Sequence, residues 1–204
     1  MVKSIMVVLV IVFFICFHLL KRYFDKQWHK KPLQNFPFFY RGKLFWYSRS
    51  VATTLGVFAQ NRKGEWHILA NKRGQGTPDF QGYWNIICGY LEHNVTGAQN
   101  CQKEAYEETG VWVPLNYIKF QSLNTDPSEN RQNVSLRYIA VLPGKCEDYD
   151  TSKEYCETNE VSDIQWIPLT DIDKYQWAFN HNSLIVEMFN ALVIRDGQLY
   201  HYEE

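Results

Sequence analysis

The chain has 204 residues, of which 46% are apolar and 16% aromatic, and its formal net charge is -1. This length and composition suffice for one hydrophobic core and exclude an intrinsically disordered chain. The near-zero net charge also argues against a dedicated nucleic-acid binder, which usually carries a basic excess. The charge is unevenly placed, since residues 1–31 carry +5 and residues 32–204 carry -6. The two segments therefore need separate interpretations.

An apolar run occupies residues 5–20, interrupted by a single histidine. As a helix it would extend about 24 Å, close to the roughly 30 Å hydrocarbon core of a bilayer. A cleaved signal peptide is the alternative, but it needs small residues after the run, and Lys21 and Arg22 stand there instead. The run therefore predicts one N-terminal transmembrane helix over residues 1–22, followed by a juxtamembrane linker over residues 23–40.

The orientation of this predicted anchor follows from the basic residues around it. Five lysines and arginines follow the run within residues 21–31, and one precedes it. The positive-inside rule then predicts a single-pass membrane protein whose following domain is cytosolic. The five cysteines show no metal or disulfide spacing, which agrees with a reducing compartment. Two glycosylation sequons, at Asn94 and Asn133, favour a lumenal or secreted alternative.

Residues 41–204 read as one folded domain. Runs rich in aromatic and β-branched residues alternate with turns. They predict strands at residues 43–47, 53–60, 66–70, 84–88, 111–113, 117–123, 134–142 and 164–167. Thr96 and Gln99 form a capping-box pattern, and Gly110 marks a helix end. A second amphipathic helix is predicted at residues 183–194. This order favours a mixed sheet flanked by at least two helices.

Three glutamates share one face of the first predicted helix. Glu104, Glu107 and Glu108 stand at positions i, i+3 and i+4, so their carboxylates lie close together and repel one another. A hard divalent cation such as Mg²⁺ would offset this repulsion, because it prefers oxygen ligands. A solvated acidic face is the simpler alternative.

The segment from Gly89 to Val111 resembles the Nudix box, G-x5-E-x7-R-E-U-x-E-E-x-G-U, where U is a bulky aliphatic residue. The residues that match it in register are Gly89, Glu104, Glu107, Glu108, Gly110 and Val111. The segments at residues 73–92, 163–169 and 177–181 resemble the flanks of that family. The resemblance implies an α/β (α+β) fold, with a mixed β-sheet sandwiched between helices over residues 41–204.

Two positions depart from the family pattern. Val95 stands where the family has a glutamate, and valine binds no metal. Lys103 stands where the family has an arginine that orients the neighbouring glutamate, and lysine lacks the planar two-pronged donor. Glu92 can partly replace the missing carboxylate. The departures predict a site that is weakened but retains its central glutamates.

The resemblance implies metal-dependent hydrolysis of a pyrophosphate bond in a nucleoside diphosphate linked to another moiety, with an ADP-ribose-like compound as one example. It implies Mg²⁺ or Mn²⁺ as the cofactor. The implied metal ligands are Glu104, Glu107 and Glu108 together with the backbone carbonyl near Gly89. We expect Glu104 to be the general base.

Several roles remain open at this stage. The acidic stretch at residues 147–160 offers alternative bases, namely Glu154, Glu157 and Glu160. Arg49 and Arg73 either hold substrate phosphates or serve as structural arginines. The expected partner is a nucleotide-type small molecule and not a nucleic acid, and family members often pair as homodimers. A Nudix fold that senses a nucleotide or a partner without turnover is the alternative function, and Val95 and Lys103 motivate it.

Overall fold

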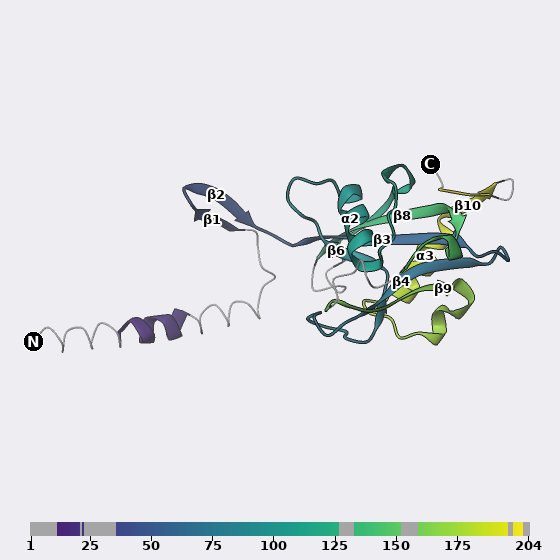
Figure 1. Cartoon of the computed structure of the whole chain (residues 1–204). Helices are drawn as coiled ribbons and strands as arrows, with labels where there is room; N and C mark the ends of the chain where they lie inside the picture. Colours follow the sequence, from purple (N-terminus) through teal and green to yellow (C-terminus); the bar gives the residue numbers. More distant parts are fainter. Residues whose placement is uncertain are drawn as a thin grey trace, which may run out of the picture. The chain divides into compact units, whose positions relative to one another are not determined.

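The structure is a computed structural model that describes residues 12–20, 22, 36–126, 133–151, 159–195 and 198–201. The chain divides into two compact units, Met1–Ser48 and Arg49–Glu204 (Figure 1). Each unit is described by itself below.

The structure of the first unit contradicts the predicted transmembrane helix. Its described helical stretch covers residues 12–20, which extend only about 14 Å at 1.5 Å per residue. The start of the apolar run lies outside the described residues. Among the helices of the described residues, none is both long enough and apolar enough to span a bilayer. The predicted anchor, and with it the single-pass membrane localisation, is therefore not supported.

A short hairpin completes the first unit. Strands β1 (Phe36–Tyr40) and β2 (Lys43–Tyr47) pair in antiparallel register. The two loop residues, Arg41 and Gly42, have φ angles of 48° and 73°, as a two-residue hairpin loop matched to the strand twist requires. The rings of Phe38 and Phe45 stack across the strands with their centroids 5.7 Å apart.

The second unit is built on a mixed β-sheet. Its seven strands are β3 (Val51–Gln60), β4 (Trp66–Arg73), β5 (Trp84–Asn85), β6 (Ile87–Tyr90), β7 (Lys119–Asn124), β8 (Val134–Lys145) and β9 (Val161–Pro168). The order is β5-β4-β3-β8-β7, with β6 paired to β3 and β9 paired to β4. Strands β3 and β8 are parallel, whereas the other pairs are antiparallel. The predicted mixed sheet is confirmed.

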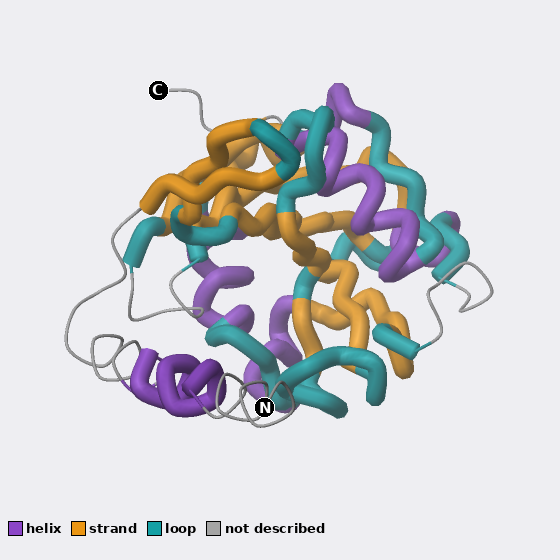
Figure 2. Tube along the Cα trace, turned by 90° about the vertical axis from the view of Figure 1, so that its left-hand side faces the viewer, coloured by secondary structure: helices purple, strands orange, loops and turns teal. Residues whose placement is uncertain are grey.

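Two helices cover opposite faces of this sheet, α2 (Gly97–Thr109) and α3 (His181–Asn190). Alternate residues of β3 face opposite sides: Leu55 and Val57 join the core cluster that includes residues of α2, and Phe58 joins the cluster that includes residues of α3. Figure 2 shows helical segments on both sides of the strands. The central strand is consequently buried on both faces, and the sandwich expected from the family resemblance is confirmed.

The boundaries of α2 match the sequence signals. Thr96 accepts a hydrogen bond from the Gln99 N–H, and the Gln99 side chain accepts one from the Thr96 N–H, which completes the capping box. Gly110 ends the helix with a φ of 72°. This left-handed conformation favours glycine.

Two predicted elements differ from the structure. Residues 111–113 form no strand: the Val113 carbonyl accepts a hydrogen bond from Gln102 of α2, and the side chains of Val111 and Val113 enter the core. The second helix begins at His181 and ends at Asn190. Beyond it, β10 (Leu192–Arg195) pairs with β11 (Gln198–His201). Three short 3-10 helices complete the described elements, η1 (Leu115–Tyr117), η3 (Cys146–Asp148) and η5 (Leu169–Lys174).

Candidate functional site

A cavity of about 340 Å³ opens in the second unit and is lined by residues of α2 and of the start of α3. The described residues that line it come from β3, β4, β5, β6, β8, both helices and the loop after β4. They are Ala52, Thr54, Asn71, Arg73, Thr77, Pro78, Asp79, Asn85, Cys88, Gly89, Tyr90, Glu104, Glu108, Asn133, Ser135, Glu160, Phe179 and His181.

Glu108 is the more deeply buried of the two helix glutamates in this cavity. Its Oε2 accepts hydrogen bonds from the Asn71 side chain at 2.8 Å and from the Cys88 N–H at 3.2 Å. Burial raises the pKa of Glu108 well above its usual value, and the nearby Glu104 carboxylate raises it further. The two hydrogen bonds favour the charged form but do not outweigh these effects.

Glu104 lies one helical turn before Glu108 and faces the backbone of Gly89. A Cβ atom at position 89 would overlap the Glu104 carboxylate, so only glycine allows this close approach. Burial raises the pKa of Glu104 to about 7, against the opposing effect of Lys103. A carboxyl group with this pKa exchanges its proton near neutral pH, which suits a general base.

The Glu107 side chain does not line the cavity, unlike those of Glu104 and Glu108. It pairs with Lys103 at 2.9 Å, and Lys103 also pairs with Glu92 at 2.8 Å. These two bonds raise the pKa of Lys103 above its usual value. The three side chains are partly exposed, and none of them is among the described lining residues. Lys103 thus holds two carboxylates together outside the cavity.

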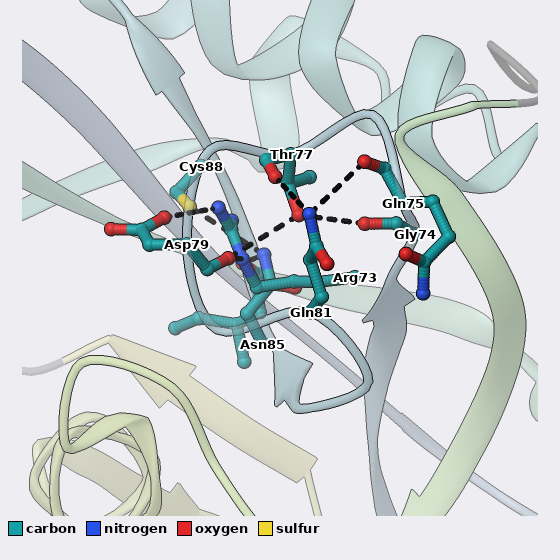
Figure 3. Close-up of polar contacts among 9 residues, drawn as sticks. Arg73, Gly74, Gln75, Thr77, Asp79, Gln81, Asn85 and Cys88 are labelled. Carbon is teal, nitrogen blue, oxygen red and sulfur yellow. Dashed lines mark hydrogen bonds and ion pairs between the residues drawn. The ribbon is translucent and has the colours of Figure 1, made fainter.

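Arg73 enters the cavity at the end of β4 and is fixed by the loop that follows. Its Nη2 donates to the Asp79 carboxylate at 2.8 Å, and its Nε donates to the Asp79 carbonyl at 3.0 Å (Figure 3). Its guanidinium carbon lies 4.9 Å from the centre of the Phe179 ring. Both groups of the ion pair are largely buried, so the arginine is held in one orientation.

Further bonds hold this loop and the adjacent strand. Gln81 donates to the Gln75 and Thr77 carbonyls, which closes the loop as Figure 3 shows. Asn85 donates to the Cys88 sulfur at 3.6 Å. The Asn85 Oδ1 is buried, and no group of the described residues donates to it. Burial raises the pKa of the Cys88 thiol to about 12, so this sulfur is a neutral thiol.

The structure brings together some of the residues singled out in the sequence. Glu104, Glu108, Gly89 and Arg73 line the cavity, and Glu160 lies at its wall. Glu154 and Glu157 fall outside the described residues. Arg49 instead donates to the Thr125 and Asn133 carbonyls. Within the described part of the chain, no cluster of three or more histidine, cysteine or carboxylate side chains is arranged to hold a metal ion.

Among the lining residues that were not expected from the sequence, Asn71 and Asn85 carry polar side chains close to the helix glutamates. Asn71 and Asn85 face each other across β4 and β5, and Asn71 donates to Glu108. No local motif marks either of them, because strand pairing alone brings them to the site. His181 was noted only for its resemblance to a family segment, and its side chain reaches the cavity.

Comparison with known proteins identifies the family. The model of the NUDIX domain matches residues 51–188. The NUDIX domain of Shewanella oneidensis NrtR, solved with ADP-ribose, is 21% identical, with a TM-score of 0.60 over 71% of this chain and 88% of that one. A MutT/nudix family protein from Enterococcus faecalis is 17% identical, with a TM-score of 0.57 over 83% of this chain and 68% of that one.

A third similar structure comes from a longer protein. It is a bifunctional NMN adenylyltransferase/ADP-ribose pyrophosphatase from Francisella tularensis, solved with AMP and a manganese ion. It is 17% identical, with a TM-score of 0.56, and the match covers 81% of this chain but 44% of that one. A comparison with curated protein sequences finds no match. The family-model match spans more than half of the sequence, and the chain therefore belongs to the Nudix family.

Proposed function

We propose that this protein hydrolyses a pyrophosphate bond in a nucleoside diphosphate linked to another moiety, with ADP-ribose as the first compound to test. The observation that carries the proposal is the cavity, where two partly buried carboxylates of α2, Glu104 and Glu108, face the same space as Arg73. Negative groups suited to a metal and a positive group suited to phosphate thus share one site. The ADP-ribose and AMP bound in the similar structures support the choice of substrate class.

The donor set fits a hard divalent cation such as Mg²⁺ or Mn²⁺. Glu104 and Glu108 are oxygen donors whose buried charges repel, and the backbone of Gly89 lies beside them. A cation between the two carboxylates would remove the repulsion that raises the pKa of Glu108. Glu107 would join this set only after leaving Lys103. Once bound, the cation would offset the charge of the pyrophosphate oxygens and polarise the attacking water.

The chain's own residues would then position the groups and move the proton. Asn71 and the Cys88 N–H fix the Glu108 carboxylate. Glu104, whose pKa is near 7 without metal, would take the proton of the attacking water as general base. Arg73, held by Asp79, would bind phosphate oxygens by charge-assisted hydrogen bonds. Lys103 would orient Glu92 and Glu107 at the edge of the site.

The direct experiment is a hydrolysis assay of the full chain with Mg²⁺ or Mn²⁺. The panel contains ADP-ribose, NADH, dinucleoside polyphosphates, nucleoside triphosphates, nucleotide sugars and coenzyme A. A Glu108→Gln variant controls for contaminating activity, because it keeps the side-chain shape but loses the charge. Turnover that requires metal and is lost in the variant supports the proposal. Equal release by both proteins, or none from any compound, contradicts it.

One observation favours a second function, nucleotide sensing without turnover. Lys103 replaces the arginine of the family pattern and pairs with Glu107 outside the cavity, so that only two of the three helix glutamates line it. This arrangement would retain a nucleotide pocket while weakening metal binding. Thermal stabilisation by ADP-ribose that needs no metal, together with no turnover of the panel, would favour this alternative.

A further inference from the structure

His181 is a buried histidine with a defined tautomer. It is 3% exposed and begins α3. Its Nδ1 lies 3.2 Å from the backbone nitrogen of Ile86. Because that N–H is a donor, Nδ1 is the acceptor and the ring proton is on Nε2. Burial lowers the pKa of His181 to about 3, and Arg73 and Arg137 lower it further. The ring is therefore neutral at physiological pH, with one N–H left to donate.

This remaining donor is available to the cavity. His181 is one of the lining residues. Among the described residues, the fully buried polar atoms without a hydrogen-bond partner do not include its Nε2. No described group accepts a hydrogen bond from it. A ligand that displaces water from this donor must supply a hydrogen-bond partner to compensate for the loss of water. A ligand in the cavity is in a position to supply that partner.

The backbone before His181 is strained in a way that directs side chains into the cavity. Phe179 and Asn180 have φ angles of 55° and 57°, and a bulky residue such as phenylalanine rarely adopts this conformation. Hydrogen bonds at 2.8 Å hold the turn to both backbone groups of Trp84. Strain of this kind persists where the surroundings impose it and is concentrated at ligand-binding sites. Here it places Phe179 and His181 on the same cavity wall.

The surroundings of His181 include the Arg73 guanidinium, whereas the α2 side of the cavity carries carboxylates. The Phe179 ring lies between two donors: the Arg73 guanidinium carbon is 4.9 Å from its centre, and the His181 ring centroid is 5.5 Å from its centroid. The Cys88 N–H bonds to Glu108, and the N–H of Ile86, two residues earlier, bonds to His181. Glu108 and His181 are thus both anchored to one short stretch of backbone, and both line the same cavity.

We infer that His181 donates its Nε2 proton in a hydrogen bond to a diphosphate oxygen of the substrate and so positions, beside Arg73, the phosphate that is not bound at Glu104 and Glu108. His181 is thus a binding residue for anionic oxygen that acts as a neutral donor. The inference rests on the proposed function, because that function supplies the diphosphate. It goes beyond that function in assigning the second phosphate to α3.

Two substitutions distinguish the hydrogen bond that His181 accepts from the Ile86 N–H from the hydrogen bond that its Nε2 would donate to a ligand. His181→Asn keeps an amide oxygen near the Nδ1 position, so the Ile86 N–H retains an acceptor, but nothing reaches the position of Nε2. His181→Gln places an amide N–H near the Nε2 position and leaves the Ile86 N–H without an acceptor. Each variant of the full chain is titrated calorimetrically with inorganic pyrophosphate and Mg²⁺, and its thermal midpoint is measured. Adenosine serves as the phosphate-free control.

The inference predicts opposite patterns for the two variants. His181→Asn should keep its thermal midpoint and bind pyrophosphate about tenfold more weakly, because it loses a hydrogen bond to a charged group. His181→Gln should melt earlier and bind within about threefold of the unaltered chain. Adenosine binding should not change in either variant. Unaltered pyrophosphate affinity in His181→Asn, or weakening that follows the thermal midpoint in both variants, overturns the inference.

Failure of the inference and failure of the proposed function give different results. An unaltered chain that does not bind pyrophosphate overturns the assignment of His181, whatever its turnover of the panel. The expected binding pattern without turnover of any compound supports the assignment and contradicts only the hydrolase proposal.

Discussion

Replacing Glu108 with glutamine should stabilise the metal-free chain even though it removes a residue proposed for turnover. Glutamine keeps the oxygen that accepts hydrogen bonds from Asn71 and Cys88. Its amide nitrogen would face the Glu104 carboxylate in place of a second negative oxygen. The substitution thus removes the ionisable group whose charged form is disfavoured by burial and by the charge of Glu104.

The magnitude follows from proton linkage. The folded pKa of Glu108 lies above the usual 4.5, so between these two values the folded chain binds more protons than the unfolded chain. Stability then falls as pH rises through this window, by up to about 1.4 kcal/mol per pH unit. Between pH 5.5 and 7.5 the free energy of unfolding of the unaltered chain should therefore drop by up to about 3 kcal/mol relative to Glu108→Gln.

The assay is urea denaturation at pH 5.5, 6.5 and 7.5 with a chelator present. Glu107→Gln is the matched control, because it makes the same chemical change at the adjacent residue, whose side chain lies on the partly exposed side of α2. It loses an ion pair with Lys103, which at a partly exposed site contributes no more than about 1 kcal/mol. Its free energy of unfolding should therefore stay close to that of the unaltered chain, or fall slightly.

Two results would refute this reasoning. A Glu108→Gln variant that is less stable than the unaltered chain at pH 7.5 would mean that the buried carboxylate is net stabilising. An equal gain in Glu107→Gln would mean that the effect comes from the net charge of the helix rather than from burial. Adding Mg²⁺ should reduce the difference, since a cation at Glu108 stabilises the unaltered chain and not the variant.

Three further predictions concern neighbouring residues. Gly89→Ala should lower kcat/KM about 100-fold or more, because its Cβ would displace Glu104; steady-state kinetics that show a loss below threefold would contradict this. Lys103→Arg should raise turnover several-fold, since a planar fork can hold Glu92 and Glu107 together; an unchanged or lower rate would show that lysine suffices. Between about pH 3 and pH 6.5, His181 is protonated in the unfolded chain but neutral in the folded chain. Stability should therefore fall by up to about 1.4 kcal/mol for each unit by which the pH decreases in this range. Urea titrations at pH 4.5 and 6.5 should show a smaller fall for His181→Asn, and equal slopes would refute the buried neutral ring.

Local signals in the sequence were sufficient for the parts of the fold that depend on near neighbours. The capping box at Thr96 and the glycine at 110 placed α2 correctly. The periodicity used for α3 continued too far, because Leu192 is buried in the same core cluster although it already belongs to β10. The N-terminal apolar run indicated a membrane span, whereas its described helix is too short for one.

The candidate site shows the same division between local and tertiary information. Helical spacing correctly grouped Glu104 with Glu108, but it could not show that Glu107 pairs with Lys103 outside the cavity. Asn71 of β4 reaches Glu108 because α2 packs on the sheet, and His181 contacts Ile86, which lies 95 residues earlier in the sequence. Contacts of this kind depend on the assembled sheet and are not encoded in any short motif.

Helix α2 thus carries two rows of charged side chains that affect stability and the proposed turnover differently. In the inner row, Glu104 and Glu108 are partly buried near each other, and their raised pKa values mean that their charged forms destabilise the metal-free fold. In the outer row, Lys103 and Glu107 pair in partial contact with solvent and contribute little. Neutral substitutions in the inner row should therefore raise stability while abolishing turnover, and those in the outer row should change both only modestly. Under the proposed function, a cation bound between the two carboxylates would offset this cost, so added Mg²⁺ should stabilise the unaltered chain more than either neutral variant of the inner row.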